Sequence, residues 1–227
     1  MNINDKNCFA INSYTLYSEA NPCIDKNSQY SNIVITQHFL LKWVIEYMRN
    51  AELETSRLKL RQWKDSDYLD FALMNADQEV MRYFPKLLNT AESNLLAVKF
   101  KTIITENGWG FWAVELKDTH QFIGFVGLHA QPSQFTFSPC VEIGWRLAKD
   151  FWHQGYATEA AQACLKFAFQ ELKLDEVVSF TAVQNQQSAQ VMQRLGMQAM
   201  QEFNHPALNQ DDPLARHILY HIKNHHF

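Results

Sequence analysis

The sequence predicts an α/β or α+β domain with a mostly antiparallel sheet flanked by helices. Three observations support this fold class. Short runs of alternating or β-branched apolar residues, typical of strands, recur between residues 56 and 222. Segments with apolar residues at helical spacing lie between these runs, most clearly at 155–171. The chain has 227 residues, of which 47% are hydrophobic, which is enough for one large core.

A change in composition predicts an N-terminal extension over residues 1–52 and a main domain over 53–227. The extension is polar, rich in Asn and Ser, and ends in one helix-like apolar stretch. One hypothesis is that natural translation starts at or near Met48, just ahead of the first predicted strand. The alternative is a genuine appendage helix. An intact mass that includes residue 1 would exclude the hypothesis of a later start.

The first elements of the main domain follow from local patterns. Leu58–Arg61 alternates apolar and charged residues, which predicts a half-buried strand. Asp65-Ser-Asp67 offers an N-cap for a helix that begins at Tyr68. A second helix is expected over Ala91–Thr105, and it ends before an Asn-Gly pair at 107–108.

Three strands are expected next. Gly110–Leu116 and Gln121–His129 are joined by a polar turn, and Cys140–Leu147 follows. The rest of the chain alternates again between helix and strand. The expected elements are a helix over Gly155–Glu171, a β-branched strand over Glu176–Val183, a short helix over Ser188–Leu195 stopped by Gly196, and closing strands over Met197–Phe203 and His217–Ile222.

Composition excludes several classes of protein. The formal net charge of −4 and the pI of about 6.1 are not typical of a nucleic-acid binder. No apolar run is long enough for a membrane span, and the polar N-terminus does not resemble a secretory signal. We therefore expect a cytoplasmic protein. The four cysteines are scattered without a C-x-x-C pair, which argues against a zinc site or disulfides: Cys8, Cys23, Cys140 and Cys164.

The most informative segment joins a strand to the start of a helix over residues 141–160. The first turn of a helix leaves backbone N–H groups unpaired at the positive end of the helix dipole. Small residues such as Gly155 and Ala157 let an anion approach these groups, so a phosphate or diphosphate fits there. The alternative is a glycine that only permits a tight turn. Neither the P-loop motif nor the G-x-G-x-x-G motif is present.

A second glycine, Gly144, lies inside the strand before that helix. An interior glycine is typical of a bulge or of a close approach by a ligand. A strand splayed at this point would expose N–H and C=O groups. Those groups could bind an amide-containing chain such as pantetheine, or stabilise an oxyanion.

The segment resembles the acetyl-CoA motif of the GNAT superfamily of N-acetyltransferases, and within it the RimJ/RimL type that acts on ribosomal-protein N-termini. The resemblance covers residues 54–223, and it implies the GNAT fold with the sheet splayed at the acetyl-CoA site. The matching segments are Val141-Glu-Ile-Gly-Trp-Arg-Leu147, Gly155-Tyr-Ala-Thr-Glu-Ala160, Thr55-Ser-Arg-Leu-Lys-Leu-Arg61, Val183-Gln-Asn-Gln-Gln-Ser188 and Met192-Gln-Arg-Leu-Gly-Met197.

The resemblance implies acetyl-CoA as cosubstrate and no metal. One position departs from the family pattern Q/R-x-x-G-x-G/A, because Trp152 stands at the Q/R place. Backbone N–H groups supply most phosphate contacts in this pattern, so the departure concerns only a side-chain contact. The implied coenzyme-binding residues are Trp145, Arg146, Leu147, His153, Gln154, Gly155, Tyr156, Ala157, Thr158 and Asn185.

The implied mechanism is direct attack of an amine on the thioester. A base must first take the proton of the ammonium group, and Glu142 matches a strand carboxylate that serves so in some relatives. The alternative is a structural carboxylate. Ser188 matches the residue that protonates the departing thiolate, although serine is also a good helix N-cap. Asn185 would bind the pantetheine arm, or act as a turn residue.

Other candidate residues carry less of the argument. His217 and His221 fall on one face of the last strand, and with His225 and His226 they could bind metal, although we expect surface histidines. The aromatic segment Trp109–Trp112 could line an acceptor pocket, but core packing is more typical. The polar loop from Phe203 to Arg216 is of a kind that often shapes specificity.

Three functions remain open from the sequence. The first is acetylation of a peptide or protein N-terminus, and the second is acetylation of a small amine such as a polyamine, amino acid or drug. The third is a non-catalytic module that senses acetyl-CoA. We expect an amine acceptor as partner, no nucleic acid, no membrane, and a monomer or homodimer.

Overall fold

A computed structural model describes residues 51–224, so the N-terminal extension up to residue 50 lies outside the described residues. Eight strands form one sheet in the order β1-β2-β3-β4-β5-β6-β8-β7. All neighbours are antiparallel except β5 and β6. The predicted fold class is therefore confirmed. The strands are β1 (Leu53–Glu54), β2 (Leu58–Arg61), β3 (Phe111–Leu116), β4 (Phe122–Gln131), β5 (Cys140–Leu147), β6 (Glu176–Ala182), β7 (Gln198–Asn204) and β8 (Arg216–Lys223).

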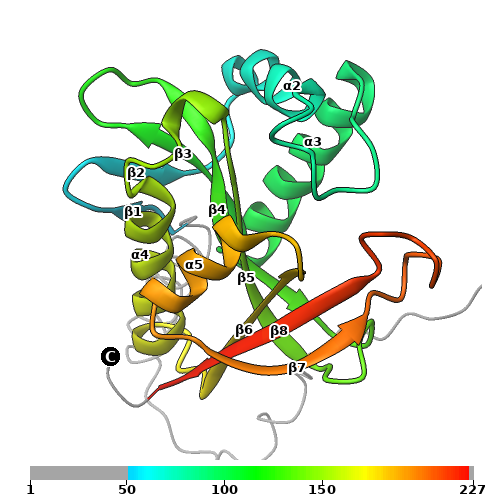
Figure 1. Cartoon of the computed structure of the whole chain (residues 1–227). Coiled ribbons are helices and arrows are strands. Elements are labelled where there is room, and N and C mark those ends of the chain that lie inside the picture. Colours follow the sequence, from blue (N-terminus) through cyan, green and yellow to red (C-terminus); the bar gives the residue numbers. More distant parts are fainter. Residues whose placement is uncertain (1–50, 225–227) are drawn as a thin grey trace, which may run out of the picture. The chain divides into compact units, whose positions relative to one another are not determined.

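Within residues 51–224, four α-helices cover the two faces of the sheet (Figure 1). Helices α2 (Tyr68–Ala76) and α3 (Thr90–Asn107) lie on one face, and α4 (Tyr156–Gln170) and α5 (Gln186–Arg194) lie on the other. Neighbouring residues of β3 show this division, because successive side chains of a strand point to opposite faces. Phe111 packs against Phe100 of α3 with ring centroids 5.0 Å apart, whereas Trp112 packs edge-on against Phe167 of α4 at 5.5 Å.

The register of β4 and β5 extends this division to the middle of the sheet. Directly opposed residues of antiparallel strands share a face. Phe111 is opposite Gly127, which is opposite Gly144 of β5. The α2–α3 face of β5 therefore carries Glu142, Gly144 and Arg146, and the α4 face carries Ile143, Trp145 and Leu147.

The helix bounds follow from recognisable local signals. Asn89 caps α3 by accepting a hydrogen bond from the Glu92 N–H at 2.9 Å, and Gly108 ends it in the left-handed region with φ +78. The predicted apolar stripe of α4 is buried, and Cys164 and Leu165 have no exposed surface. Ser188–Leu195 was expected to be the following short helix, but α5 begins two residues earlier, at Gln186.

The predicted cap at Asp65-Ser-Asp67 is wrong in detail. These residues form a 3-10 turn of their own, and the Asp67 side chain makes no capping bond to α2. Its carboxylate instead accepts from the Lys64 N–H at 2.8 Å and pairs with Arg61. A buried arginine nearby attracts the carboxylate more strongly than a helix N–H does, which sequence spacing does not reveal.

Arg61 is the centre of a buried ion network. It is 3% exposed, and its guanidinium donates to both oxygens of Asp67 at 2.8 Å and to Glu115 at 2.5 Å. Burial alone would raise the pKa of Glu115, but hydrogen bonds from Arg61, Lys64 and His120 outweigh it and lower the pKa to about 2. The network joins β2, β3 and the start of α2, and so fixes one edge of the sheet.

We predict that Glu115→Gln lowers the free energy of unfolding by about 3 kcal/mol at pH 7, because Arg61 loses one of two buried carboxylate partners. Denaturant unfolding measures this change. Since the folded-state pKa lies below the ordinary value of 4.5, the stabilisation is present above that value and is lost as pH falls towards 2. If the difference in unfolding free energy between Glu115→Gln and the unaltered protein does not shrink over this range, the role of Glu115 in the network is contradicted.

Asp65→Asn is the control. It removes the exposed pair with Lys101 and should change stability by less than about 1 kcal/mol.

Candidate active site

The sheet opens between β5 and β6. These two parallel strands share a single residue pair, Glu142 opposite Val178. Beyond it, residues 143–147 have no partner strand on that side, and the Ser179 hydroxyl donates to the Ile143 carbonyl at 2.8 Å. The splay that the sequence predicts at Gly144 is therefore present. A cavity of about 990 Å³ occupies the opening.

Eleven of the twelve predicted site residues line this cavity. Gln154 is the exception, since its side chain donates to the Asp150 carbonyl at 2.9 Å outside the cavity wall. The lining residues among those predicted are Glu142, Trp145, Arg146, Leu147, His153, Gly155, Tyr156, Ala157, Thr158, Asn185 and Ser188.

The N-terminus of α4 presents free amides to the cavity. Gly155 is the N-cap residue in the left-handed region with φ +82, and His153 also has a positive φ of 60. Within residues 51–224 no protein acceptor binds the N–H groups of 156–158. Successive free amides at the positive end of a helix dipole form an anion site. Glycine suits this turn because L side chains are strained at this φ.

Glu159, in the first turn of α4, ties the start of this helix to the segment before β2. Its carboxylate accepts from the Thr55 hydroxyl at 2.6 Å and from the Ser56 hydroxyl at 3.0 Å. Burial would raise the pKa of Glu159, but the hydrogen bonds from Thr55 and Arg57 lower it. The ionised carboxylate therefore locks the helix start against the segment that precedes β2.

Arg57 completes this attachment, and sequence reasoning missed its role. Its guanidinium pairs with Glu159 at 2.6 Å, donates to the Gln154 carbonyl at 3.0 Å and lies 4.3 Å above the Tyr156 ring. The Arg57–Glu159 pair thus braces the turn that carries the free amides. The motif at 55–61 contained the signal, but the contact spans about a hundred residues, so spacing alone could not place it.

The departure from the family pattern at Trp152 has a structural explanation. The indole Nε1 donates to the Leu147 carbonyl at 2.8 Å. This bond holds the loop before α4 against the end of β5. The side chain at this position therefore positions the loop, and the backbone amides remain available to an anion.

Glu142 lies on the cavity wall with one hydrogen-bond partner. Gln131 Nε2 donates to its Oε2 at 2.8 Å and lies 3.1 Å from His129 Nδ1. Burial raises the pKa of Glu142 to about 7, against the opposing effect of the Gln131 bond. Burial and the charge of Lys99 lower the pKa of His129, which keeps that ring neutral and able to accept from Gln131.

Asn185, and not Ser188, caps α5. The Asn185 Oδ1 accepts from the Ser188 N–H at 3.2 Å, and Ser188 lies three residues inside the cap. The Asn185 amide nitrogen donates to the Thr181 hydroxyl at 2.9 Å and to the Ser188 Oγ at 3.1 Å. The interpretation of Ser188 as N-cap is therefore wrong. Its hydroxyl oxygen accepts from Asn185, which leaves its hydrogen free to donate into the cavity.

Arg146 lies on the α2–α3 face of β5, away from the start of α4. Its side chain is 9% exposed, and its Nη1 donates to the Asn75 Oδ1 at 2.6 Å. The guanidinium carbon lies 3.9 Å above the Phe84 ring. That Arg146 binds the coenzyme stays a prediction from the sequence.

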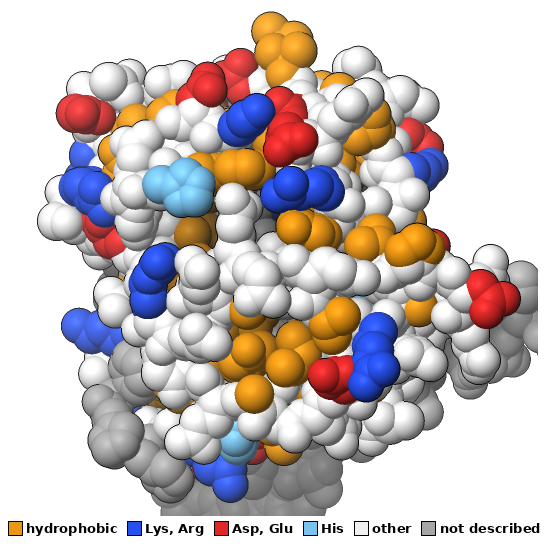
Figure 2. Space-filling model, viewed as in Figure 1, with side chains coloured by type: hydrophobic (Ala, Val, Ile, Leu, Met, Phe, Trp, Pro, Cys, Tyr) orange, Lys and Arg blue, Asp and Glu red, His pale blue; other side chains and the backbone are white. Residues whose placement is uncertain are grey.

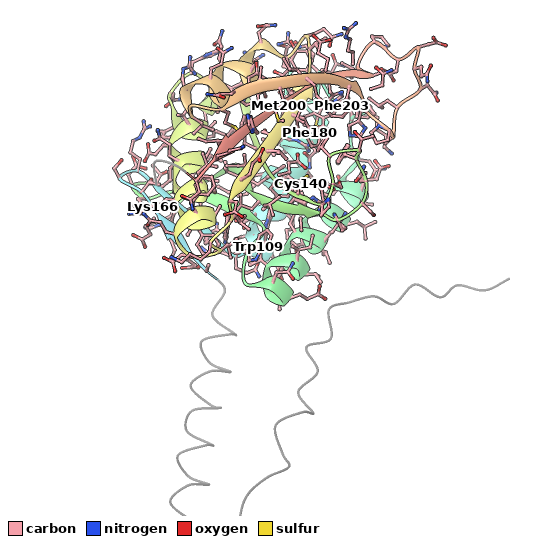
Figure 3. The ribbon with its side chains drawn as sticks, turned by 90° about the horizontal axis from the view of Figure 1, so that it is seen from below. Trp109, Cys140, Lys166, Phe180, Met200 and Phe203 are labelled. Atoms are coloured by element: carbon pink, nitrogen blue, oxygen red, sulfur yellow. The ribbon has the colours of Figure 1, made fainter. Side chains whose placement is uncertain are left out.

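Aromatic rings form the wall opposite α2 and α3. Phe180 of β6 and Phe203 of β7 lie side by side with centroids 5.7 Å apart (Figure 3). Phe180 also contacts His217, which packs against His205 at 4.9 Å. Phe180 and both histidines line the cavity. Burial lowers the pKa of each histidine, so both are neutral at pH 7.

The expectation of surface histidines is wrong for His217, which is 9% exposed. Rings of Phe180, Phe203 and His205 pack against it, which the sequence alone does not show. His221 pairs with Glu176 at 2.6 Å, while His225 and His226 lie outside the described residues. Among residues 51–224 no group of three or more potential metal ligands is found.

Two further expectations concern aromatic and loop residues. Trp112 is fully buried in the core and donates to the Ala51 carbonyl at 2.7 Å, as expected for core packing. Its neighbour Phe111 lines the cavity. His205 and Leu208, from the loop between β7 and β8, also line it.

The surface adds two observations. On the face shown in Figure 2, Lys and Arg side chains are interspersed with Asp and Glu. In the described part of the chain no helix combines the length and apolar character needed to cross a membrane.

Comparison with known proteins identifies the class. Residues 57–198 match the acetyltransferase (GNAT) domain family. A Bacillus subtilis (strain 168) protein, "Uncharacterized protein YkkB", is 31% identical over 150 residues, which are 65% of this chain and 85% of the relative.

Two solved structures share the fold. Ribosomal-protein-S5-alanine acetyltransferase from Vibrio fischeri has a TM-score of 0.62 at 20% identity, covering 78% of this chain and 98% of its own. Spermidine N-acetyltransferase from Vibrio cholerae, in complex with CoA and spermine, has a TM-score of 0.59 at 17% identity, covering 75% and 97%.

The family match over residues 57–198 identifies an acyltransferase domain. More particularly, the chain belongs to the GNAT acetyltransferase family, and it is an enzyme. The family uses acetyl-CoA, and its members act on an amine acceptor.

The corrected cap gives a direct prediction. Asn185→Ala should lower the free energy of unfolding by about 1 kcal/mol, because α5 loses the acceptor for its Ser188 N–H. Ser188→Ala should change it by less than about 0.5 kcal/mol, since that side chain caps no N–H. Chemical denaturation of both variants measures the difference, and a larger loss in Ser188→Ala would restore the original interpretation.

Proposed function

We propose that the chain transfers an acetyl group from acetyl-CoA to a primary amine, of a peptide or protein N-terminus or of a small molecule, by direct attack in a ternary complex. One observation carries the proposal. A single cavity joins the free amides of α4, on one side of the splay, to the Glu142 carboxylate with its raised pKa, on the other. Acetyl transfer needs both an anion site for the coenzyme and a base for the amine.

The coenzyme-binding part of the proposal rests on α4 and β5. The amides of 155–158 would hold the diphosphate at the positive end of the helix dipole, and the Arg57–Glu159 pair would brace that turn. Residues 143–147, which lack a strand partner beyond the single pair, offer backbone groups to the amides of pantetheine. Among the predicted contacts, Asn185 has its amide hydrogens engaged within the protein, so a lone pair of Oδ1 is what it can offer.

Glu142 is proposed as the base. With a pKa of about 7 it is half ionised at neutral pH, and an ionised carboxylate can take the ammonium proton directly or through one water. Gln131 holds the carboxylate in place through its Oε2. The neutral amine then forms the new C–N bond as the C–S bond of the thioester breaks.

Ser188 is proposed as the proton donor to the departing thiolate. Its Oγ accepts from Asn185, which directs the free hydroxyl hydrogen away from that residue. Its place on the cavity wall is consistent with this role.

The acceptor class is a finer question. The fold resembles one acetyltransferase named for a ribosomal protein and another named for spermidine, with similar TM-scores, so fold likeness does not choose between them. A RimJ/RimL-like activity and a cytoplasmic location stay predictions from the sequence. A sensor role is not favoured, because the family that the chain matches is one of acetyltransferases.

An acceptor screen with detection of released thiol tests the proposed acetyl transfer. Absence of transfer to any amine would overturn it.

Gly155→Asp should weaken acetyl-CoA binding at least tenfold in calorimetry, because a carboxylate then competes with the diphosphate for the amides. Gly155→Asn is the matched control. Asparagine has nearly the same shape and also tolerates a positive φ, but it carries no charge. Equal losses in the two variants would show that the backbone strain, and not the anion site, matters here.

Glu142→Gln should remove the break near pH 7 from the pH profile of kcat/KM. In the unaltered enzyme kcat/KM should fall about tenfold per unit below pH 7, because the base becomes protonated. The variant should bind acetyl-CoA normally and have a rate lowered by about 10²-fold or more at pH 8. An unchanged pH–rate profile would exclude Glu142 as the base.

A further inference from the structure

Arg146 is a buried cation without a counter-ion. Of the donors on its guanidinium, one hydrogen bond is formed within the described residues, to the neutral amide oxygen of Asn75. Its Nε is completely buried and has no hydrogen-bond partner. Within residues 51–224 Arg146 makes no ion pair. Burial lowers its pKa to about 10, with no carboxylate to oppose the effect.

Arg61 is a second buried arginine in this chain, and it differs from Arg146 in having counter-ions. It is similarly buried, and two carboxylates, Asp67 and Glu115, neutralise it through three hydrogen bonds of 2.5 to 2.8 Å. An isolated buried charge is costly, so buried arginines are normally paired. The contrast indicates that Arg146 takes its anion from outside the chain.

The surroundings of Arg146 hold it in place without neutralising it. Asn75 has no exposed surface, and it is itself fixed by donating to the Ser93 hydroxyl at 2.8 Å. The guanidinium lies over Phe84 at 3.9 Å and near Phe125 at 5.4 Å. A planar guanidinium fixed in this way, with donors left over, is suited to bidentate binding of a carboxylate.

The coenzyme diphosphate does not fit this site. The free amides that would hold it belong to the start of α4, on the other face of the sheet. Arg146 shares its face with Glu142, with the side-chain-free Gly144 between them. Each lies about 7 Å along the strand from Gly144. The Glu142 Oε1 leans over this gap, 3.7 Å from where a Cβ on Gly144 would stand.

We propose that the acceptor amine also carries a carboxylate, which Arg146 binds at the α2–α3 end of the cavity while the amino group lies beside Glu142. This inference rests on the proposed acetyl transfer and names its substrate class. A small amino acid has both groups on one short body. Phe84, Phe111 and Phe125 give that end of the cavity apolar walls, so an apolar side chain fits best. A polyamine would meet an uncompensated positive charge there.

Matched pairs of acceptors test this proposal. The full chain with acetyl-CoA is assayed by thiol release with L-leucine and L-phenylalanine against L-leucinamide and L-phenylalaninamide, which keep the amine but lack the carboxylate. The free acids should have kcat/KM at least about tenfold higher, as expected for charge-assisted hydrogen bonds to a buried arginine. The less basic amine of the amides favours them in this assay, so a preference for acids cannot come from amine reactivity.

Arg146→Met should abolish this discrimination, chiefly by raising KM for the acids, while calorimetry shows unchanged acetyl-CoA binding. Arg146→Lys should recover part of the preference, because it keeps the charge without the planar fork. A purely structural role would lower the melting temperature and leave the preference intact. Arg82→Met is the control, since it removes an exposed arginine that lies between α2 and α3 and does not line the cavity.

Two results would overturn the inference: amides accepted as well as acids, or a preference that persists in Arg146→Met. Transfer to amides or peptides but not to acids contradicts the carboxylate site and leaves the proposed acetyl transfer intact. A protein that binds acetyl-CoA yet acetylates none of these amines, nor a peptide N-terminus or spermidine, contradicts both.

Discussion

The structure depends on the divergence of β5 from β6 after one residue pair. Were the two strands paired throughout, the sheet would be closed and the backbone of residues 143–147 would be satisfied within it. Because they part at Glu142 and Val178, a passage opens through the sheet and connects its two faces. The Ser179 hydroxyl bridges back to the Ile143 carbonyl and so satisfies one group at the fork. This bond fixes the point at which the two strands part.

Because side chains alternate along β5, the two faces of the sheet carry different functional groups. On the α4 side stand the helix start and its free amides, braced by Arg57 and Glu159. On the α2–α3 side stand Glu142, which is half-buried, and Arg146, which is buried, with a glycine between them. Burial has opposite consequences for these two charges. It brings the pKa of Glu142 to a value useful for proton transfer, and it leaves Arg146 in need of an anion.

Much of this arrangement could be predicted from the sequence, because its signals are local. Gly155 before an apolar helix and Gly144 inside a strand indicated the anion site and the splay without any tertiary information. The face on which the Arg146 side chain lies also follows from the sequence, since residues 142 and 146 of one strand share a face.

Contacts between distant segments could not be predicted. Arg57 reaches Glu159 across 102 residues, and His217 is buried by rings from elsewhere in the chain. At α5 two good capping residues stand three apart, and the bond from the Ser188 N–H to the Asn185 Oδ1 shows that Asn185 takes that role.

The central claim is that the opening between β5 and β6 holds the coenzyme, with its diphosphate on the start of α4. A crystal structure of the full chain with coenzyme A bound tests this most directly. The account predicts diphosphate oxygens within hydrogen-bonding distance of backbone nitrogens among residues 155–158, and pantetheine passing along residues 143–147. Coenzyme density on the α2–α3 face, with its diphosphate on Arg146, would contradict the claim.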